Sequence, residues 1–157
     1  MNPFDPSFDD LPESLPIFPL PGVLLLPRGR LPLNIFEPRY LSMVSDAIGS
    51  TRLIGMVQPK DPSEREPNPG VYKTGCAGRI VNFEETDDGR FLITLLGCSR
   101  FDIHDELPLS RGYRAIEPDW TPYRYDLEKP VPCQIDRDRL LSGLHGFFEL
   151  HGIEVDW

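Results

Sequence analysis

Residues 15–40, LPIFPLPGVLLLPRGRLPLNIFEPRY, decide the fold that the sequence predicts. This stretch places six prolines between apolar runs that are too short for helices, and it ends in a pattern that starts a helix at Pro38. Proline fixes φ and has no backbone N–H, so such a stretch suits short edge strands joined by tight corners. We therefore expect a mostly β protein that opens with short strands over residues 15–20 and 31–36.

Between these strands lies the wholly apolar run VLLL at residues 23–26. The turn dipeptide Pro21-Gly22 precedes it, and Pro27 begins the corner that follows. A short continuous apolar run between turn signals is typical of a segment that is covered on both sides. We expect this run to be buried.

The first predicted helix covers residues 38–48. Pro38 suits the first helical position, Gly49 suits the stop, and the charge of Glu37 suits the positive end of the helix dipole. Apolar side chains recur along this segment at i, i+3 and i+4 spacing and form one stripe: Tyr40, Leu41, Val44, Ala47 and Ile48. A strand over residues 51–57 follows.

Residues 71–105 predict a long β-hairpin with its turn at residues 87–89, Asp-Asp-Gly. Gly97 interrupts the returning run and indicates a bulge or bend there. The alternation of side chains predicts which residues face inward: Val81, Phe83, Phe91, Ile93 and Leu95. A further strand over residues 113–120 completes a β-rich domain at 15–133, after a loose lead-in at 1–14 that Phe4 and Phe8 could attach to the body.

The composition changes at Asp136, a good N-cap, after which apolar residues recur at helical spacing before Gly152. We expect residues 134–157 to begin a C-terminal helical segment that is truncated at Trp157. Its apolar stripe is costly to leave in water, so it should pack on the β-rich body, on further helices or on another copy of the chain. Of these we expect self-association, with Leu144 and Phe148 at its centre.

The composition bounds the function. With 25 acidic and 16 basic side chains the formal net charge is −9, which disfavours nucleic acid and anionic membranes as partners. The three cysteines have no C-x-x-C spacing, the acidic N-terminus does not resemble a signal peptide, and no apolar stretch approaches the ~18 residues that span a bilayer. We expect a cytoplasmic protein without a metal or other cofactor. His104 beside Asp102 and Glu106 indicates a solvated strand end rather than a metal site.

The order of motifs in residues 15–40 resembles the N-terminal substrate-binding domain of Lon protease, in the form of short stand-alone bacterial Lon-domain proteins. The motifs that carry the resemblance are LP at 15–16, FPL at 18–20, GVLLLP at 22–27, PL at 32–33 and IFEPRY at 35–40. The resemblance implies a PUA-like fold, a twisted antiparallel sheet curled into an open pseudo-barrel with one inserted helix. It also implies a binding module rather than an enzyme. The chain contains neither the G-x-x-x-x-G-K-[S/T] loop of an ATPase nor a recognisable Ser-Lys pair.

One cluster of charged and aromatic residues permits two interpretations. Glu37, Arg39 and Arg28 could form a charged lip beside Phe36 and Tyr40 that grips a peptide. Alternatively, Glu37 and Arg39 fix the strand–helix corner while Tyr40 packs inward, and we favour this second interpretation.

The candidate partner-binding residues are therefore Phe36, Arg39 and Tyr40, together with Leu144 and Phe148 of the C-terminal helix. The first functional hypothesis is a non-catalytic module that binds proteins or peptides in a groove or along a sheet edge. The alternative is a small-molecule sensor that uses the mouth of the barrel. RNA binding, by analogy with PUA-like folds, is disfavoured by the net charge.

Overall fold

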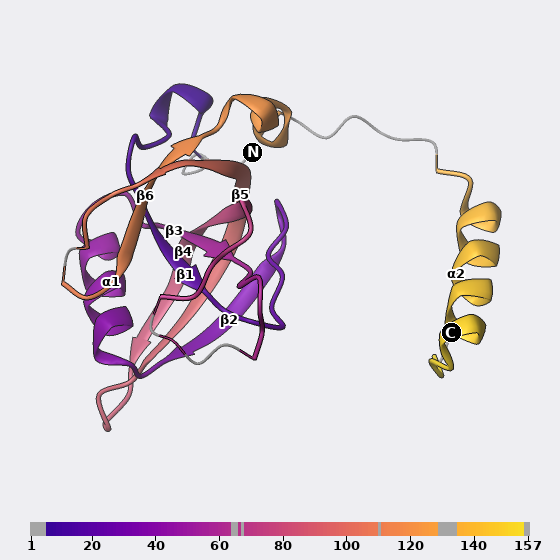
Figure 1. The fold of residues 1–157 in the computed structure, drawn as a ribbon, viewed down its shortest axis with the longest axis horizontal. Helices are drawn as coiled ribbons and strands as arrows, with labels where there is room; N and C mark the ends of the chain where they lie inside the picture. The colour runs from indigo at the N-terminus through magenta and orange to yellow at the C-terminus, as the bar shows by residue number, and fades with distance from the viewer. Residues whose placement is uncertain (1–5, 64–65, 67, 110, 129–134, 156–157) are drawn as a thin grey trace.

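The structure is a computed structural model, and it describes residues 6–63, 66, 68–109, 111–128 and 135–155 (Figure 1). The strands in this part of the chain are β1 (Leu15–Pro19), β2 (Arg30–Ile35), β3 (Leu53–Val57), β4 (Thr74–Glu85), β5 (Phe91–Glu106) and β6 (Arg114–Asp119). The α-helices are α1 (Pro38–Ile48) and α2 (Arg137–His151), and the 3₁₀ segments are η1 (Phe8–Asp10) and η2 (Thr121–Leu127).

The six strands form one sheet in the order β2-β5-β4-β3-β1-β6, and the long strand β5 also pairs with β6. The pairings β5-β4-β3-β1-β6 therefore return to β5, so that five strands make a closed circuit and β2 lies outside it. Only the β1–β3 pair is parallel among the strand pairs of the described residues. The predicted mostly β fold with a curled sheet is confirmed, although the sheet is not a regular barrel.

The core consists of two groups of buried side chains, one beneath α1 and one around β5. The first group joins the inner face of α1 to β2, β3 and the hairpin: Ile35, Tyr40, Met43, Val44, Ile54 and Ile93 are among its members. The second group surrounds Phe101, which is fully buried, and includes Leu15, Ile17, Ile116 and Trp120. Burial of these apolar side chains stabilises the curled sheet.

Helix α1 begins and ends where the sequence predicts, with Pro38 at its first position and Gly49 at its C-cap. The carboxylate of Glu37 does not cap the helix and instead accepts a hydrogen bond from Arg39 Nε at 3.0 Å. Tyr40 and Val44 are buried as expected from the apolar stripe. Figure 1 shows α1 lying along one side of the strands.

The predicted hairpin is present as β4 and β5, and its turn contains Gly89 at φ 79°. The bend predicted at Gly97 is also present, because the register of β4 and β5 shifts beside it. A Cβ at Gly97 would lie only 2.0 Å from the carbonyl oxygen of Leu26. Two backbone hydrogen bonds fix this crossing, from Arg28 N to Gly97 O and from Gly97 N to Gly29 O, each 2.8 Å long.

The predicted inward face of the hairpin is right for β5 and wrong for part of β4. Ile93 and Leu95 are buried, whereas Val81 and Phe83 are 37% and 43% exposed. A register shift between Ile80 and Asn82 leaves Val81 without a partner in the ladder, so Ile80 faces the core instead. Phe83 retains an edge-to-face contact with Phe91 (ring centroids 4.9 Å apart).

The expectation that residues 23–26 are covered on both sides is wrong. Only Leu25 is buried, while Leu24 and Leu26 are 72% and 55% exposed. The segment belongs to no strand, because corners with positive φ at Gly22 (73°) and Arg28 (68°) turn the chain at both of its ends. It crosses the bend of β5 instead of pairing along a strand.

The predicted lead-in is described from residue 6 onward. Phe8 in η1 and Leu11 pack against the second core group, and the guanidinium of Arg124 lies 4.3 Å from the Phe8 ring. Trp120 Nε1 donates a hydrogen bond to the Pro12 carbonyl at 3.0 Å, which fixes this segment to the end of β6. Phe4 lies outside the described residues.

Helix α2 has the predicted boundaries. The Asp136 carboxylate accepts a hydrogen bond from Arg139 N at 3.0 Å, and Gly152 ends the helix at φ 62°. No described residue of α2 is buried, although Leu144 and Phe148 are partly covered. Among the described residues no helix is both long and apolar enough to cross a membrane.

Candidate functional site

A groove of about 400 Å³ lies where the end of β1, strand β2 and the start of α1 meet the segment after β3. Its lining is apolar and rich in proline, with a few polar side chains among them: Phe18, Pro19, Leu20, Pro21, Pro32, Leu33, Asn34, Phe36, Glu37, Arg39, Tyr40, Pro59, Pro62, Glu66 and Pro69. The sequence motif IFEPRY therefore supplies one end of a groove, and the structure brings three of the predicted partner-binding residues together in it.

Tyr40 forms part of the groove floor. It is 5% exposed, and its ring lies 4.1 Å from that of Phe18, centroid to centroid. The Arg39 guanidinium covers the Tyr40 ring at 4.5 Å and forms an ion pair with Glu37. Burial raises the pKa of the Tyr40 hydroxyl, and the charge of Arg39 opposes the rise. The Glu37–Arg39 ion pair and the burial of Tyr40 agree with the interpretation in which these two charged residues fix the corner and Tyr40 packs inward.

Phe36 is an exposed apolar residue in the groove lining. It is 64% exposed, although Ile35 immediately before it is 2% exposed and belongs to the core. The change from the end of β2 to the start of α1 turns the Phe36 ring out of the core and onto the groove. Arg39 keeps part of its side chain accessible beside it (29% exposed).

The prolines of the lining limit what the groove can bind. Six of the fifteen lining residues are prolines, and proline has no backbone N–H to donate. Two of these six lie on strands, Pro19 at the end of β1 and Pro32 on β2, and among the described strands β2 pairs only with β5. The groove therefore offers apolar surface and carbonyl acceptors, and few main-chain donors.

The segment that follows β3 forms the far wall, which the sequence did not predict. The four prolines and mixed charges of residues 59–70 are typical of an exposed loop, and most of the described residues there are exposed. Pro59, however, is buried and pairs with Val71 in an antiparallel bridge. Backbone hydrogen bonds from Lys60 N to Gly70 O (2.7 Å) and from Tyr72 N to Gln58 O (2.9 Å) close the base of the segment. The wall depends on the pairing of Pro59 with Val71, which are more than ten positions apart, and local sequence patterns do not predict such a pairing.

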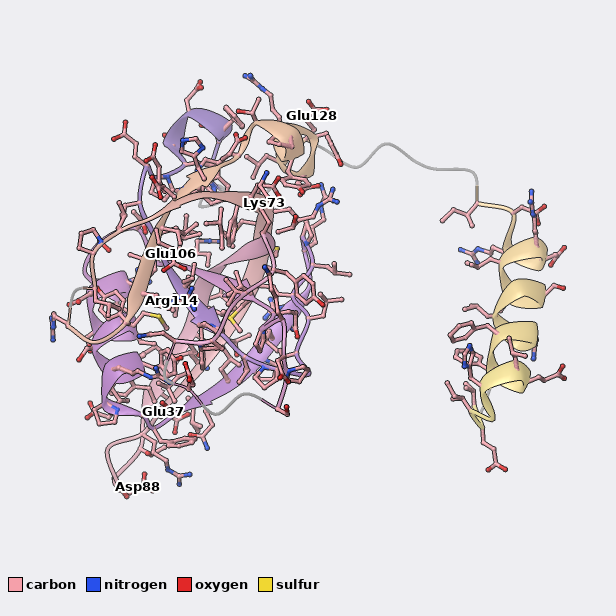
Figure 2. The ribbon with its side chains drawn as sticks, in the orientation of Figure 1. Glu37, Lys73, Asp88, Glu106, Arg114 and Glu128 are labelled. Atoms are coloured by element: carbon pink, nitrogen blue, oxygen red, sulfur yellow. The ribbon has the colours of Figure 1, made fainter. Side chains whose placement is uncertain are left out.

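Arg28 does not belong to the Glu37–Arg39 cluster, which corrects the predicted grouping. Its Nη2 donates to the carbonyl oxygens of Asp126 (3.3 Å) and Glu128 (2.6 Å), at the end of η2. Figure 2 labels Glu128 at this end of the fold. The same region holds a second cluster that sequence reasoning missed, in which Arg100 binds the Asp126 carboxylate through Nε (2.9 Å) and Nη2 (2.8 Å).

Leu144 and Phe148, the other two predicted partner-binding residues, lie on α2 and do not line the groove. The structure therefore separates the five predicted residues into two locations. Around His104, the Asp102 carboxylate accepts hydrogen bonds from Thr74 (2.7 Å) and Tyr123 (3.0 Å). Among the described residues, no group of three His, Cys, Asp or Glu side chains is arranged to hold a metal ion.

Comparison with known proteins identifies similar sequences. Residues 14–132 match the family described as the ATP-dependent protease La (LON) substrate-binding domain. The chain is 30% identical over 105 residues to Lon protease 2 of Sorangium cellulosum, covering 66% of this chain and 13% of that protein. It is 29% identical over 106 residues to Lon protease of Dictyoglomus thermophilum, covering 68% of this chain and 13% of the relative. The chain thus spans a small fraction of the length of these proteases.

Comparison with solved structures agrees. The crystal structure of a Lon N-terminal domain protein from Xanthomonas campestris has a TM-score of 0.59 and 27% sequence identity, covering 87% of this chain and 73% of that chain. The N-terminal domain of the Mycobacterium avium complex Lon protease has a TM-score of 0.54, covering 89% and 72%. Because its identity is 14%, this second similarity supports the fold alone. The resemblance predicted from the motifs in residues 15–40 is confirmed.

Proposed function

Because the chain belongs to the family of the ATP-dependent protease La (LON) substrate-binding domain, we propose that it recognises protein substrates without catalysing a reaction. In this proposal the groove at Phe36, Arg39 and Tyr40 binds exposed apolar segments of unfolded proteins. The ATPase and protease parts of a Lon protease are not needed for such binding.

The observation that supports this proposal best is the exposed Phe36 ring beside an apolar groove. Phe36 is 64% exposed, and covering its ring with a partner lowers the free energy because apolar area leaves water. The Arg39–Glu37 ion pair at the same edge offers both a donor and an acceptor to the main chain of a bound segment.

The proline lining favours side-chain recognition over strand addition. A peptide that adds a strand to a sheet edge depends on main-chain hydrogen bonds along that edge. Pro32 removes one donor from β2, which has a single neighbour among the described strands. We therefore propose that the groove holds the apolar side chains of its substrate, which tolerates many different sequences.

The proposal excludes nucleic acid and membranes as partners, since the net charge of −9 repels phosphate-rich surfaces. It also places the protein in the cytoplasm, where cell fractionation can locate it. A small molecule bound in the mouth of the barrel is the alternative that the sequence left open. Mass spectrometry of the protein purified from its own cells would support that alternative by recovering one low-mass compound at stoichiometric amounts.

Binding to an unfolded protein tests the proposal directly. The probe is fluorescently labelled α-lactalbumin that is reduced and carboxymethylated so that it stays unfolded, and the folded form of the same protein is the control. We expect saturable binding of the unfolded form only. Phe36→Ser should weaken it about tenfold through lost apolar contact. Leu24→Ser should not weaken it, because Leu24 is exposed but lies outside the groove lining.

Self-association through α2 is a separate part of the proposal. Leu140, Leu141 and Phe147 are between 44% and 52% exposed, so their side chains favour a partner that removes them from water. We propose that a second copy of the chain provides this cover, with Leu144 and Phe148 central. Changing both to Asp should give a monomer with an unchanged β-sheet signal. Light scattering that finds the unmodified chain monomeric at high concentration would contradict this proposal.

A further inference from the structure

The far wall of the groove contains no strand of the sheet among its described residues, so something else must fix its position. Pro59, Pro62, Glu66 and Pro69 form this wall, and the pairing of Pro59 with Val71 holds only its base. A groove presents a constant shape to its partner only if both walls are fixed relative to each other.

We propose that Arg114 is the positioning residue that fixes this wall to the sheet. Arg114 lies on β6 and its side chain is 10% exposed. Its Nη1 donates to the carbonyl oxygen of Pro69 at 2.7 Å, and its Nη2 donates to Glu106 Oε1 at the end of β5. Figure 2 shows Glu106 and Arg114 next to each other.

The shape of the guanidinium makes this link rigid. Its nitrogens lie in one plane at fixed separations, so a group bound to Nη1 is held at a fixed position relative to a group bound to Nη2. The Pro69 carbonyl is thereby tied to β5 through Glu106. Arg114 Nε is buried and has no hydrogen-bond partner among the described residues. The two terminal nitrogens therefore provide the hydrogen bonds that hold this guanidinium in place.

Arg114 itself is not one of the residues that line the groove. It therefore does not contact a bound segment directly. Its neighbour in the β1 ladder is Ile17, which immediately precedes Phe18 of the groove floor. One residue thus connects the floor strand β1, the end of β5 and the far wall. The inference rests on the proposed function of the groove.

The test compares Arg114→Met and Arg114→Lys with the unmodified chain and with Arg111→Met. Arg111 forms an ion pair with Asp46 of α1, and neither residue lines the groove. Binding of the reduced, carboxymethylated α-lactalbumin should be about tenfold weaker in both Arg114 variants, since a lysine ammonium cannot bridge Pro69 and Glu106 as a planar fork does. Arg111→Met should bind like the unmodified chain.

Hydrogen exchange gives the readout that an effect on global stability would not reproduce. The amides of Lys60 and Tyr72, at the base of the wall, should exchange faster in the Arg114 variants, while the amides of β4 and β5 stay protected. If Arg114→Met unfolds, Arg114→Lys decides the question. Unchanged affinity and unchanged exchange in the folded variant would overturn the role of Arg114. Absence of saturable binding to the unmodified chain would instead overturn the proposed function.

Discussion

The Arg100–Asp126 ion pair should be one of the largest single polar contributions to the stability of the fold. The Asp126 carboxylate is 5% exposed and accepts three hydrogen bonds from Arg100: from the backbone N (3.0 Å), from Nε (2.9 Å) and from Nη2 (2.8 Å). Arg100 also stacks on Tyr123 at 4.7 Å. The perturbation is Asp126→Asn, which keeps the shape of the side chain and removes its charge.

The expected loss of unfolding free energy follows from the hydrogen bonds of Arg100 that an asparagine cannot accept. One of its two terminal positions is an NH₂ group, so a donor of Arg100 would face another donor. Breaking a buried ion pair by altering one partner costs about 3–5 kcal/mol. Arg100 is 34% exposed, and water can therefore replace part of the lost interaction. We expect Asp126→Asn to lower the free energy of unfolding by about 2–4 kcal/mol.

The pH dependence identifies the cause. Burial alone raises the pKa of the Asp126 carboxyl, but the hydrogen bonds and charge of Arg100 outweigh it and lower the pKa below its usual value. A lowered folded-state pKa stabilises the fold above the unfolded-state pKa of about 3.9, and this stabilisation is lost as the pH falls through the folded-state value. The difference between the unmodified chain and Asp126→Asn should therefore be constant from about pH 5 to 8 and shrink below about pH 4.

Urea unfolding followed by circular dichroism at several pH values measures both quantities. Asp88→Asn is the matched control, because its ion pair with Arg90 lies on the exposed hairpin turn. It should leave the free energy of unfolding nearly unchanged. A loss below about 1 kcal/mol for Asp126→Asn, or a difference that persists undiminished to pH 2, would refute the reasoning.

Three further predictions concern the hairpin and the absence of catalysis. Ile93→Ala should cost about 2–4 kcal/mol in thermal or urea unfolding because the side chain is 2% exposed, whereas Thr94→Ala, half-buried on the other face, should cost much less; the reverse order would contradict the assigned faces. Gly97→Ala should destabilise the fold and speed exchange of the Arg28 amide, because its Cβ would collide with the Leu26 carbonyl; a variant as stable as the unmodified chain would contradict that crossing. The purified chain should neither hydrolyse ATP nor cleave casein, and turnover that survives further purification would end the non-catalytic interpretation.

Sequence reasoning succeeded where local signals agree with one another. Pro38, the apolar stripe and Gly49 each predict the same helix, and α1 has the predicted boundaries. The hairpin turn likewise depends on neighbouring residues, with Gly89 adopting the positive φ that such a turn requires. In these segments the information that determines structure lies within a few residues, and so the sequence alone is sufficient.

Sequence reasoning failed where partners are distant in the chain. The sequence prediction grouped Arg28 with Glu37 and Arg39, but the acceptors of Arg28 lie 98 and 100 residues away at Asp126 and Glu128. The bulge that exposes Val81 depends on the register against β5, which no alternation within β4 reveals. Three of the five predicted binding residues, Phe36, Arg39 and Tyr40, line the same groove because they are neighbours in sequence. The far wall of the groove was missed because it comes from another segment.

The stretch that decides the fold also supplies most of the groove. Eleven of the fifteen lining residues come from residues 15–40. Three of these eleven are prolines, at positions 19, 21 and 32, and one is Glu37. The prolines that end β1 early and restrict β2 to one neighbour leave the adjacent apolar side chains without a covering strand. The groove therefore lies where these prolines limit strand pairing. In the proposed function, the surface offered to a partner is the part of the proline-rich opening that no strand of the described residues covers.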